Sequence, residues 1–263
     1  MPVASALVSR HKPRMTDVRT ISIGIIGANG RMGRAVAAEL SETGGERLAG
    51  LADRGDDLGA LAALSDVLID FSTPTALRDS LGAARAAERP LVVGTTGLQP
   101  DHHRAIDDAA AVIPVLHSAN MSLGVTLLAH LVRDAAARLG DDWDVEIVEM
   151  HHRHKVDAPS GTALLLGEAA ARGRGIDLAT SSVSGRDGLG EPRAAGTIGF
   201  AALRGGSVAG DHLVVLAGEG ERVELGHRAE SRAIFARGAI RAARWLHRRA
   251  PGRYAMTDVL GVA

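Results

Sequence analysis

The 263-residue sequence predicts a two-domain α/β protein, with a parallel β-sheet covered by helices in its first half and an α+β unit with a mixed sheet in its second half. Two observations lead to this prediction. Up to about residue 120, short apolar runs alternate with helical patterns, which is typical of a doubly wound parallel sheet. Beyond that point, strand-like runs and glycine-rich turns follow one another, and one long helical pattern comes near the end of the chain.

The first half contains five short apolar runs that we expect to be buried strands, at residues 21–26, 48–52, 67–71, 91–93 and 112–116. A helix should run from the glycine-rich turn after the first strand to about Leu40. Pro74 should open another helix, because proline fits the first helical position. Small and polar residues follow the strands. Since ligands bind beyond the carboxyl ends of the strands in such sheets, we expect a ligand site at this edge.

The second half has a different character. Residues 145–150 have the pattern of a half-exposed strand, in which apolar residues alternate with Glu146 and Glu149. A helix at 164–171, three antiparallel strands at 197–203, 210–216 and 221–225, and a helix at 229–247 that returns to the first domain should follow. The expected organisation is a disordered tail (1–19), a first domain (20–121 with 232–263) and a second domain (122–231).

The composition excludes several classes of function. The formal net charge of −1 provides no field that would attract nucleic acid or an anionic membrane, so neither is an expected partner. The chain contains no cysteine, which removes thiolate catalysis and cysteine metal sites and fits a reducing cytosol, so we expect a cytoplasmic location. No apolar run approaches the roughly 18 residues that a membrane-spanning helix needs.

A glycine-rich turn, Gly27-Ala28-Asn29-Gly30-Arg31-Met32-Gly33, follows the first predicted strand and opens a helix. Such a turn lets the backbone approach a pyrophosphate and offers the amides of a helix N-terminus, as in a Rossmann-like dinucleotide domain. Its glycine spacing departs from the usual motif, and an ordinary glycine turn is the alternative. Asp53 lies 20 residues after Gly33, where an acid meets the ribose hydroxyls. Arg54 could meet a 2′-phosphate, so we expect NADH or NADPH; a solvated turn is the competing interpretation.

Lys155 is the only lysine in the body of the chain. Lys12 lies in the N-terminal tail, and the other 28 basic residues are arginine. Lysine can donate a proton, whereas a guanidinium stays charged at any working pH. A chain that otherwise uses arginine therefore indicates a proton-transfer role at position 155, the alternative being a chance surface lysine.

Three histidines precede this lysine, and they admit three interpretations: a metal site, structural side chains at a domain junction, or acid–base catalysis. The spacing of His151, His152 and His154 directs their rings apart, and no further ligand motif supports a metal, so none is expected. Downstream, Ser160-Gly161-Thr162 precedes a helical run and can offer free amides and hydroxyls to a carboxylate. A plain N-cap at Ser160 is the alternative. The combination favours acid–base chemistry on a small anionic substrate.

The segment from Glu149 to Leu164 resembles the signature of the 4-hydroxy-tetrahydrodipicolinate (dihydrodipicolinate) reductase family. Five further stretches are similar to that family in the same order: 27–33, 94–97, 118–125, and the C-terminal runs 226–232 and 254–260. The resemblance implies an oxidoreductase that uses NADH or NADPH to reduce 4-hydroxy-tetrahydrodipicolinate to tetrahydrodipicolinate, with loss of water, in the diaminopimelate pathway of lysine biosynthesis. The substrate would be a small cyclic imine dicarboxylate.

The resemblance also implies roles for individual residues. His151 would be the acid/base and Lys155 the proton donor, while His152, Ser160, Gly161 and Thr162 would hold the substrate. The cofactor would be bound by Gly27, Ala28, Asn29, Gly30, Arg31, Met32, Asp53, Arg54, Gly94, Thr95, Thr96, Ser118, Ala119, Asn120 and Met121. Members of the family are typically homotetramers joined through the second domain. A non-catalytic dinucleotide sensor is the alternative, and it would need neither His151 nor Lys155.

Overall fold

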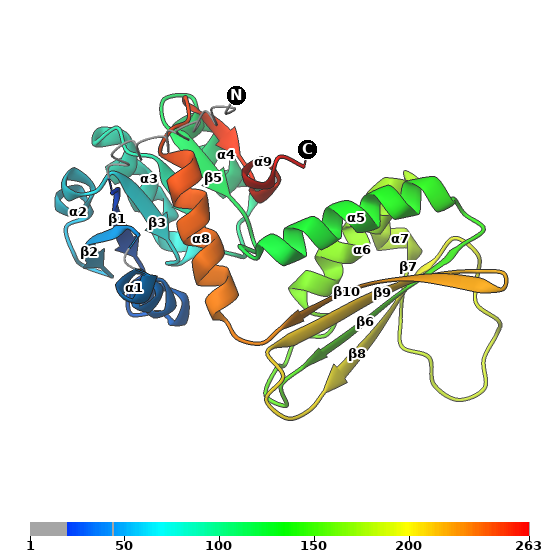
Figure 1. The fold of residues 1–263 in the computed structure, drawn as a ribbon. Helices are drawn as coiled ribbons and strands as arrows, with labels where there is room; N and C mark the ends of the chain where they lie inside the picture. The colour runs from blue at the N-terminus through cyan, green and yellow to red at the C-terminus, as the bar shows by residue number, and fades with distance from the viewer. Residues whose placement is uncertain (1–19, 44, 263) are drawn as a thin grey trace, which may run out of the picture.

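The computed structural model describes residues 20–43 and 45–262, so the tail predicted at 1–19 lies outside the described residues. The described part of the chain forms two β-sheets, each covered by helices. The chain crosses between the two halves twice, before α5 (Leu123–Leu139) and after β10 (Glu221–Ala229) (Figure 1). None of the helices in this part is long and apolar enough to span a membrane.

The first sheet has six strands in the order β11-β5-β4-β3-β1-β2, and all neighbouring strands are parallel. The strands are β1 (Ser22–Ile26), β2 (Arg47–Ala52), β3 (Val67–Asp70), β4 (Leu91–Val93), β5 (Pro114–His117) and β11 (Gly252–Tyr254). The chain winds outward from β1 in both directions, so the crevice between the ends of β1 and β3 is the position at which this fold binds ligands. The predicted Rossmann-like parallel sheet is confirmed.

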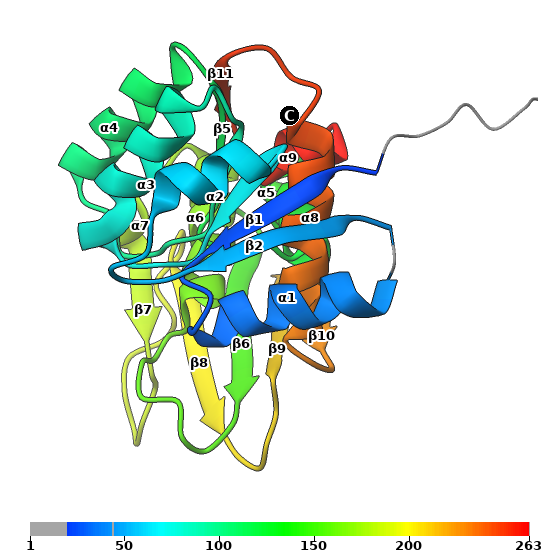
Figure 2. The ribbon, with the colours of Figure 1, turned by 90° about the vertical axis from the view of Figure 1, so that its left-hand side faces the viewer.

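Helices cover both faces of this sheet because its strands are apolar on both sides. Ile23 and Ile25 of β1 pack with α1 (Arg31–Thr43), α8 (Ala233–Leu246) and α9 (Met256–Leu260). Ile26 and the strand residue Leu68 pack on the other face with α2 (Leu58–Leu64), α3 (Leu77–Ala86) and α4 (Pro100–Ala110). Figure 2 shows these two helical layers on either side of β1 and β2. As predicted, Pro74 opens a helical turn, a 3₁₀ segment (Pro74–Ala76) that leads into α3.

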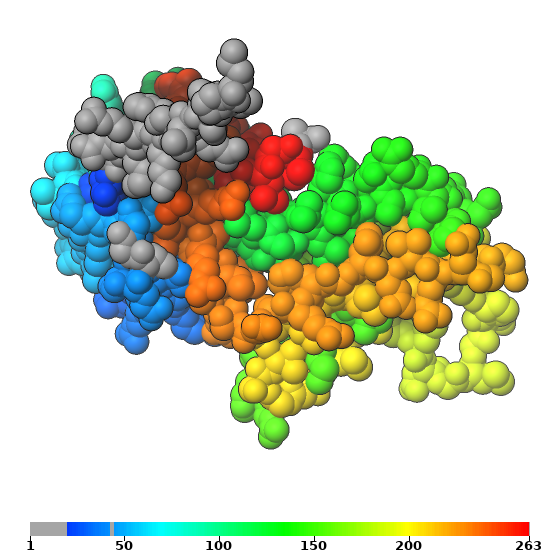
Figure 3. Space-filling model, viewed as in Figure 1, coloured from blue at the N-terminus to red at the C-terminus, as the bar shows by residue number. Residues whose placement is uncertain are grey.

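The second sheet is mixed, with the order β10-β9-β6-β8-β7. Its strands are β6 (Asp144–His151), β7 (Ser182–Ser184), β8 (Ile198–Arg204), β9 (Gly210–Gly218) and β10. The helices α5, α6 (Gly161–Arg174) and α7 (Leu178–Ser181) lie on one face (Figure 1). The space-filling view shows the loop between β7 and β8 standing away from the body of this half (Figure 3).

Two expectations for this half are wrong in detail. The antiparallel pairing of β9 with β10 is confirmed, but β8 pairs in parallel with β6, which lies between β8 and β9. Alternation in a sequence predicts which residues share a face, but it does not determine which strand pairs with which. Glu149 was expected on the exposed side of β6, yet it is only 1% exposed. Since side chains alternate with a period of two, Glu146 and Glu149 must lie on opposite faces.

Two short elements near the C-terminus were not predicted. β11 adds a sixth strand beside β5, and α9 follows it. With three and five residues respectively, both are too short to show a periodic apolar pattern. They place the end of the chain on the first sheet, next to the crossing point that leads into α5 (Figure 1).

Candidate active site

The glycine-rich loop between β1 and α1 is folded tightly onto the ends of β2 and β3. The N–H groups of Gly27 and Ala28 donate to the carbonyl of Ala52, at 2.9 and 3.1 Å. Gly27 has a φ of +79°, and a Cβ atom there would lie 2.6 Å from the carbonyl oxygen of Phe71. A Cβ atom on Gly33 would lie 2.3 Å from the carbonyl oxygen of Gly27. Glycine is therefore required at both positions, and the loop leaves the first amides of α1 facing the crevice.

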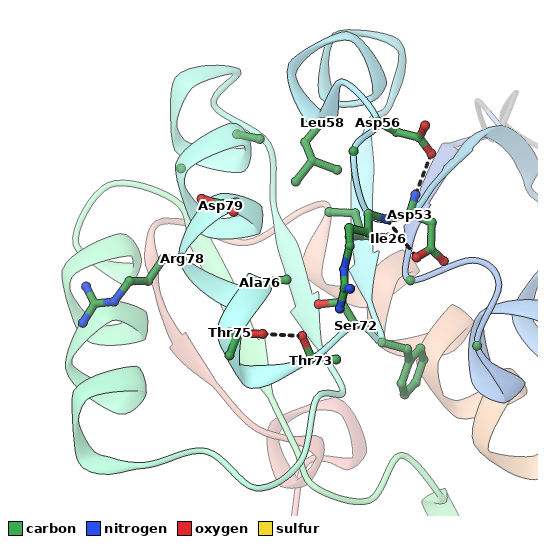
Figure 4. A pocket seen from close by; sticks show the side chains of 17 residues that line it. Ile26, Asp53, Asp56, Leu58, Ser72, Thr73, Thr75, Ala76, Arg78 and Asp79 are labelled. Atoms are coloured by element: carbon green, nitrogen blue, oxygen red, sulfur yellow. Dashed lines mark hydrogen bonds between the residues drawn. The ribbon is translucent and has the colours of Figure 1, made fainter.

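Asp53 lies at the end of β2 and joins this loop. Its two carboxylate oxygens accept from the N–H groups of Arg54 and Asn29, both at 2.8 Å. The bond from Arg54, followed by the bond from Asn29, holds the pKa of Asp53 below its ordinary value. Asp53 and Arg54 both line a cavity of about 870 Å³ at the carboxyl edge of the sheet. Asp53 and Ser72 line this cavity (Figure 4). A carboxylate and a hydroxyl beside a glycine-rich loop are groups that can bind a nucleotide.

The loop after β4 carries Gly94, Thr95 and Thr96. A Cβ atom on Gly94 would lie 2.2 Å from a ring carbon of Phe71, so the aromatic ring packs directly on the glycine. The Thr95 hydroxyl donates to Asp70 Oδ1 at 3.2 Å, and the N–H of Ser72 donates to the same oxygen at 2.7 Å. Asp70 is fully buried. It therefore holds the loops after β3 and β4 together, and it was not identified from the sequence.

The loop after β5 contains Ser118, Ala119, Asn120 and Met121. The Ser118 hydroxyl donates to the carbonyl of Asn120 at 2.7 Å. The Asn120 amide nitrogen donates to the Thr162 hydroxyl at 3.0 Å. Because Thr162 belongs to the second half, Asn120 connects the predicted cofactor loops with the predicted substrate residues. Met121 is only 2% exposed and packs in the core, and its carbonyl lies against Gly238 of α8, so the structure places it beneath the surface of this loop.

His151 ends β6, and its partner is Glu149, two residues earlier on the same face. Nδ1 of His151 lies 2.6 Å from Glu149 Oε2. Glu149 also accepts from the N–H of Ser160 at 3.1 Å and from two nitrogens of Arg204 at 2.8 and 2.9 Å. Burial by itself raises the pKa of Glu149, but the hydrogen bonds from Arg204 and His151 outweigh it and the pKa is lowered. One buried carboxylate thus joins the predicted acid/base to the start of α6.

Ser160 is the N-cap of α6, where its hydroxyl oxygen accepts from the N–H of Ala163 at 3.2 Å. The same hydroxyl lies 3.1 Å from Nε2 of His212. Burial, followed by the nearby His151, lowers the pKa of His212 to about 4, so this imidazole is neutral at physiological pH. Gly161 is exposed and Thr162 is partly exposed. The N-terminus of α6 therefore presents amides and a hydroxyl to the solvent next to His151.

Lys155 is engaged in an ion pair. Its ammonium donates to both carboxylate oxygens of Asp157, at 2.9 and 2.8 Å, and this contact is the main cause of a lowered pKa of Asp157. Arg204 donates to the carbonyls of Lys155 and Asp157, at 3.3 and 2.6 Å. No hydrogen bond between Lys155 and His151 occurs in the described structure. The loop 155–157 is therefore held by the arginine that also binds Glu149.

The remaining histidines do not form a cluster with metal-binding geometry. The rings of His152 and His154 are 6.3 Å apart. Burial, followed by the charge of Arg232, lowers the pKa of His152. Within residues 20–43 and 45–262, no three side chains of His, Asp or Glu gather in a way that could hold a metal ion.

Besides Asp70, the sequence analysis missed three residues around His151: Glu149, Arg204 and His212. The pair of Glu149 and His151 has a local signal, because residues two apart on a strand share a face. Arg204 lies 55 residues after Glu149, and His212 lies 52 residues after Ser160. Register brings them together, since Glu149 is opposite His212 on β9 and His151 is opposite Arg204 on β8.

Comparisons with known proteins agree with the resemblance noted in the motifs. Family models described as the N-terminus and the C-terminus of dihydrodipicolinate reductase match residues 21–121 and 124–260. A 4-hydroxy-tetrahydrodipicolinate reductase from Zymomonas mobilis subsp. mobilis is 56% identical over 254 residues, which cover 94% of this chain and 100% of that protein. The protein of the same name from Parvibaculum lavamentivorans is 52% identical over 266 residues, covering 92% of this chain and 98% of that protein.

Among solved structures, a dipicolinate-bound dihydrodipicolinate reductase from Paenisporosarcina sp. TG-14 has the same fold. It superposes with a TM-score of 0.75 at 22% identity, covering 91% of this chain and 98% of that chain. The family models together span most of the described chain, and the sequence relatives are similar over almost their whole length. The chain belongs to the dihydrodipicolinate reductase family.

Proposed function

We propose that this protein reduces 4-hydroxy-tetrahydrodipicolinate to tetrahydrodipicolinate, with loss of water, in the diaminopimelate pathway of lysine biosynthesis. The observation that carries the proposal is the buried Glu149–His151 pair at the N-terminus of α6, in a chain whose parallel sheet has a nucleotide-binding loop. A protein that only senses a dinucleotide has no use for this pair. The names of the relatives that align over almost the full chain support the same activity.

The cofactor in this proposal is NADH or NADPH, held at the carboxyl edge of the first sheet. The residues present fit such a group, because Gly27 and Gly33 allow the loop to fold tightly at the cavity, where Asp53 offers a carboxylate. When bound, the nicotinamide supplies the hydride. The residues assigned to the cofactor are Gly27–Met32, Asp53, Arg54, Gly94–Thr96 and Ser118–Met121. Asp53 suits ribose hydroxyls and Arg54 suits a 2′-phosphate, so both cofactors should be accepted.

The substrate in this proposal is a cyclic imine dicarboxylate held at the start of α6. A carboxylate is stabilised by free amides and by the positive end of a helix, which Gly161 and Thr162 provide, while Ser160 caps the helix and donates its own N–H to Glu149. His152 would contact the same substrate. A neighbour of the same fold is described as dipicolinate-bound, which supports a planar dicarboxylate as the ligand class.

We assign proton transfer to His151 and Lys155. The overall reaction takes up one hydride and one proton and releases one water molecule. Negative charge develops on the ring nitrogen and is neutralised when a proton is added to a ring carbon. The site therefore needs a cation and a proton donor beside the ring. Lys155 supplies the charge and can donate, and His151 acts as acid/base. The substrate dianion would compete with Asp157 for the Lys155 ammonium, which lies within 2.9 Å of both oxygens of that carboxylate.

The proposal extends to the organisation of the molecule. Residues 20–121 with 232–263 would bind the cofactor, and residues 122–231 would bind the substrate and form a homotetramer. Support for the oligomer comes from the face of the second sheet opposite α5 and α6, where Leu203 of β8 is an exposed large apolar residue. Sedimentation velocity should give the mass of four chains. A cytoplasmic location is the remaining part of the proposal.

A coupled assay tests the activity. The substrate is generated from pyruvate and aspartate semialdehyde by its synthase, and oxidation of the reduced cofactor is followed by absorbance. We expect oxidation that depends on both the synthase and this protein. Binding of NADH without any oxidation would instead identify a dinucleotide sensor.

A further inference from the structure

Glu149, Arg204 and His151 form a largely buried polar cluster, in which Glu149 and Arg204 have no individual role in the proposed proton transfer. Glu149 and His151 lie on the same face of β6, and Arg204 reaches them from the end of β8. We propose that Glu149 is a positioning residue for the known reaction of this family: its carboxylate, bound by Arg204, fixes the imidazole of His151 with Nδ1–H toward Glu149 and Nε2 toward the substrate. This inference rests on the proposed function.

The hydrogen bonds around Glu149 determine where the protons are. The N–H of Ser160 and the two nitrogens of Arg204 can only donate, so both oxygens of Glu149 act as acceptors for them. A carboxylate that accepts on both oxygens and is bound by a guanidinium stays ionised. Nδ1 of His151, at 2.6 Å from Oε2, therefore carries the hydrogen. In the neutral imidazole the other nitrogen, Nε2, then has the free lone pair.

The surroundings of Nε2 are consistent with a reacting atom. No described residue forms a hydrogen bond to it. The nearest constraint is Gly210, where a Cβ atom would lie 3.0 Å from Nε2. Any larger residue at position 210 would therefore crowd the nitrogen, and glycine keeps the space beside it open. The carboxylate side of the ring is closed, whereas Nε2, on a side chain that is 10% exposed, is not fully buried.

Glu149 also couples His151 to the groups on which the substrate is proposed to lie. The same carboxylate accepts from the backbone of Ser160, at the start of α6. Arg204, which binds the carboxylate, also binds the backbone carbonyls of Lys155 and Asp157. The acid/base, the anion-binding helix start and the lysine loop thus share one buried anchor. A change of charge at Glu149 should act on turnover through the orientation and basicity of His151.

The decisive variant is Glu149→Gln, which keeps the size of the side chain and removes its charge. The new amide can donate to Nδ1 and favour the opposite tautomer, with the hydrogen on Nε2. We expect kcat to fall by at least about tenfold with a smaller change in KM. The limb of the pH profile that reports protonation of His151 should move to lower pH, because an amide stabilises the imidazolium less than a carboxylate does. Glu149→Asp, which restores the charge, should return that limb toward its original position.

The matched control is Glu146→Gln. Glu146 lies on the opposite face of the same strand and is likewise bound by arginines, Arg186 and Arg193. Its replacement should leave kcat and the pH profile unchanged. A readout independent of activity is the tautomer of His151, observed by ¹⁵N NMR of the imidazoles and assigned with His151→Gln. We expect the Nδ1–H form in the original protein and a shift toward Nε2–H in Glu149→Gln.

Several results would overturn the inference. One is a folded Glu149→Gln protein with the original kcat, pH profile and tautomer. Another is a loss of activity in Glu149→Gln and Glu149→Asp that follows their melting temperatures while the tautomer is unchanged, since Glu149 would then only support the fold. The proposed function fails separately, if the unchanged protein binds NADH and does not turn over the substrate.

Discussion

At the scale of single residues, the site separates charge from proton transfer. Arg204 provides a permanent positive charge to a buried carboxylate, whereas Lys155 is the side chain that can lose a proton. In this structure the Lys155 ammonium is held by Asp157, whose carboxylate is exposed, with a side-chain relative accessibility of 58%. Such an exposed pair is weak, so an incoming dianion can replace Asp157 without a large loss of stability.

Replacement of Lys155 tests whether proton donation is needed. Lys155→Ala removes both charge and donation, and Lys155→Arg keeps the charge but does not deprotonate at working pH. A positioned proton donor contributes about 10²–10⁴-fold in rate. We expect both variants to lose at least about a hundredfold in kcat, with NADH affinity unchanged by fluorescence titration and a lower KM for Arg than for Ala. Near-normal turnover of Lys155→Arg would show that lysine serves only as a positive charge.

Asp53 and Arg54 should set the choice of cofactor. Asp53→Ala should weaken NADH more than NADPH, because the carboxylate binds ribose hydroxyls and repels a 2′-phosphate. Arg54→Ala should have the reverse effect. Since Asp53 also accepts from the N–H of Asn29, Asp53→Asn serves as the control that keeps an acceptor for the loop. Dissociation constants for both cofactors measure this, and equal effects on the two would place the pair outside the ribose pocket.

At the scale of the element, the start of α6 is a helix cap and is also the proposed substrate-binding segment. Ser160 caps the helix, and Ser122 caps α5 in the same way, with N–H···Oγ distances of 3.2 Å in both cases. Both serines are buried to 2% exposure. The two caps should be similar in their effect on folding, but only the cap of α6 lies beside His151 and Thr162.

We therefore expect Ser160→Ala and Ser122→Ala to lower the free energy of unfolding by a similar amount, about 1 kcal/mol each. Only Ser160→Ala should also raise KM for the substrate. Urea unfolding and steady-state kinetics on the two variants measure these effects. If both variants raise KM equally, the helix start has no specific part in binding the substrate.

At the scale of the whole molecule, stability should depend on pH through buried histidines. Burial, followed by the nearby His103 and Arg253, lowers the pKa of His117 from 6.5 to about 4. His212 has a similarly low pKa, also near 4. Between pH 6.5, the ordinary pKa of histidine, and about pH 4, these histidines bind protons in the unfolded chain but not in the folded protein. Stability is therefore complete above about pH 6.5 and declines as the pH falls toward 4.

The expected slope for each histidine is at most about 1.4 kcal/mol per pH unit, and less for His117 because it is only partly buried. His117→Gln should flatten the dependence of the free energy of unfolding on pH between 6.5 and 4. Chemical denaturation at several pH values gives this slope. A variant with the same slope as the original protein would mean that folding does not lower the pKa of His117.

The chain crosses between the two halves of the molecule twice, and the first crossing, at Asn120, connects the predicted sites. Asn120 follows β5 in the first half and donates to Thr162 in the second. The side chain of the same residue accepts from the N–H of Ser122, at the start of α5. The segment where the chain crosses between the halves is therefore also the segment that places the cofactor loops next to α6 (Figure 1).

The parallel sheet, its glycine loop and the segment from His151 to Thr162 could all be predicted from the sequence. In each case the information is local: an apolar strand, a glycine turn with its helix, or a polar run before an N-cap. The family signature is contiguous for the same reason. These features can be predicted without knowing the tertiary contacts, because periodicity and turn chemistry act over a few residues.

The distant residues that complete the site could not be predicted and are seen only in the folded chain. Arg204 and His212 reach β6 from two different strands, because β6 lies between β8 and β9, and the pattern of alternation did not reveal this order. Phe71 requires glycine at position 94 through a contact between two loops. The short β11 became a strand only because β5 had a free edge. Strand order and close packing depend on contacts between segments tens of residues apart, and local sequence patterns carry no record of those contacts.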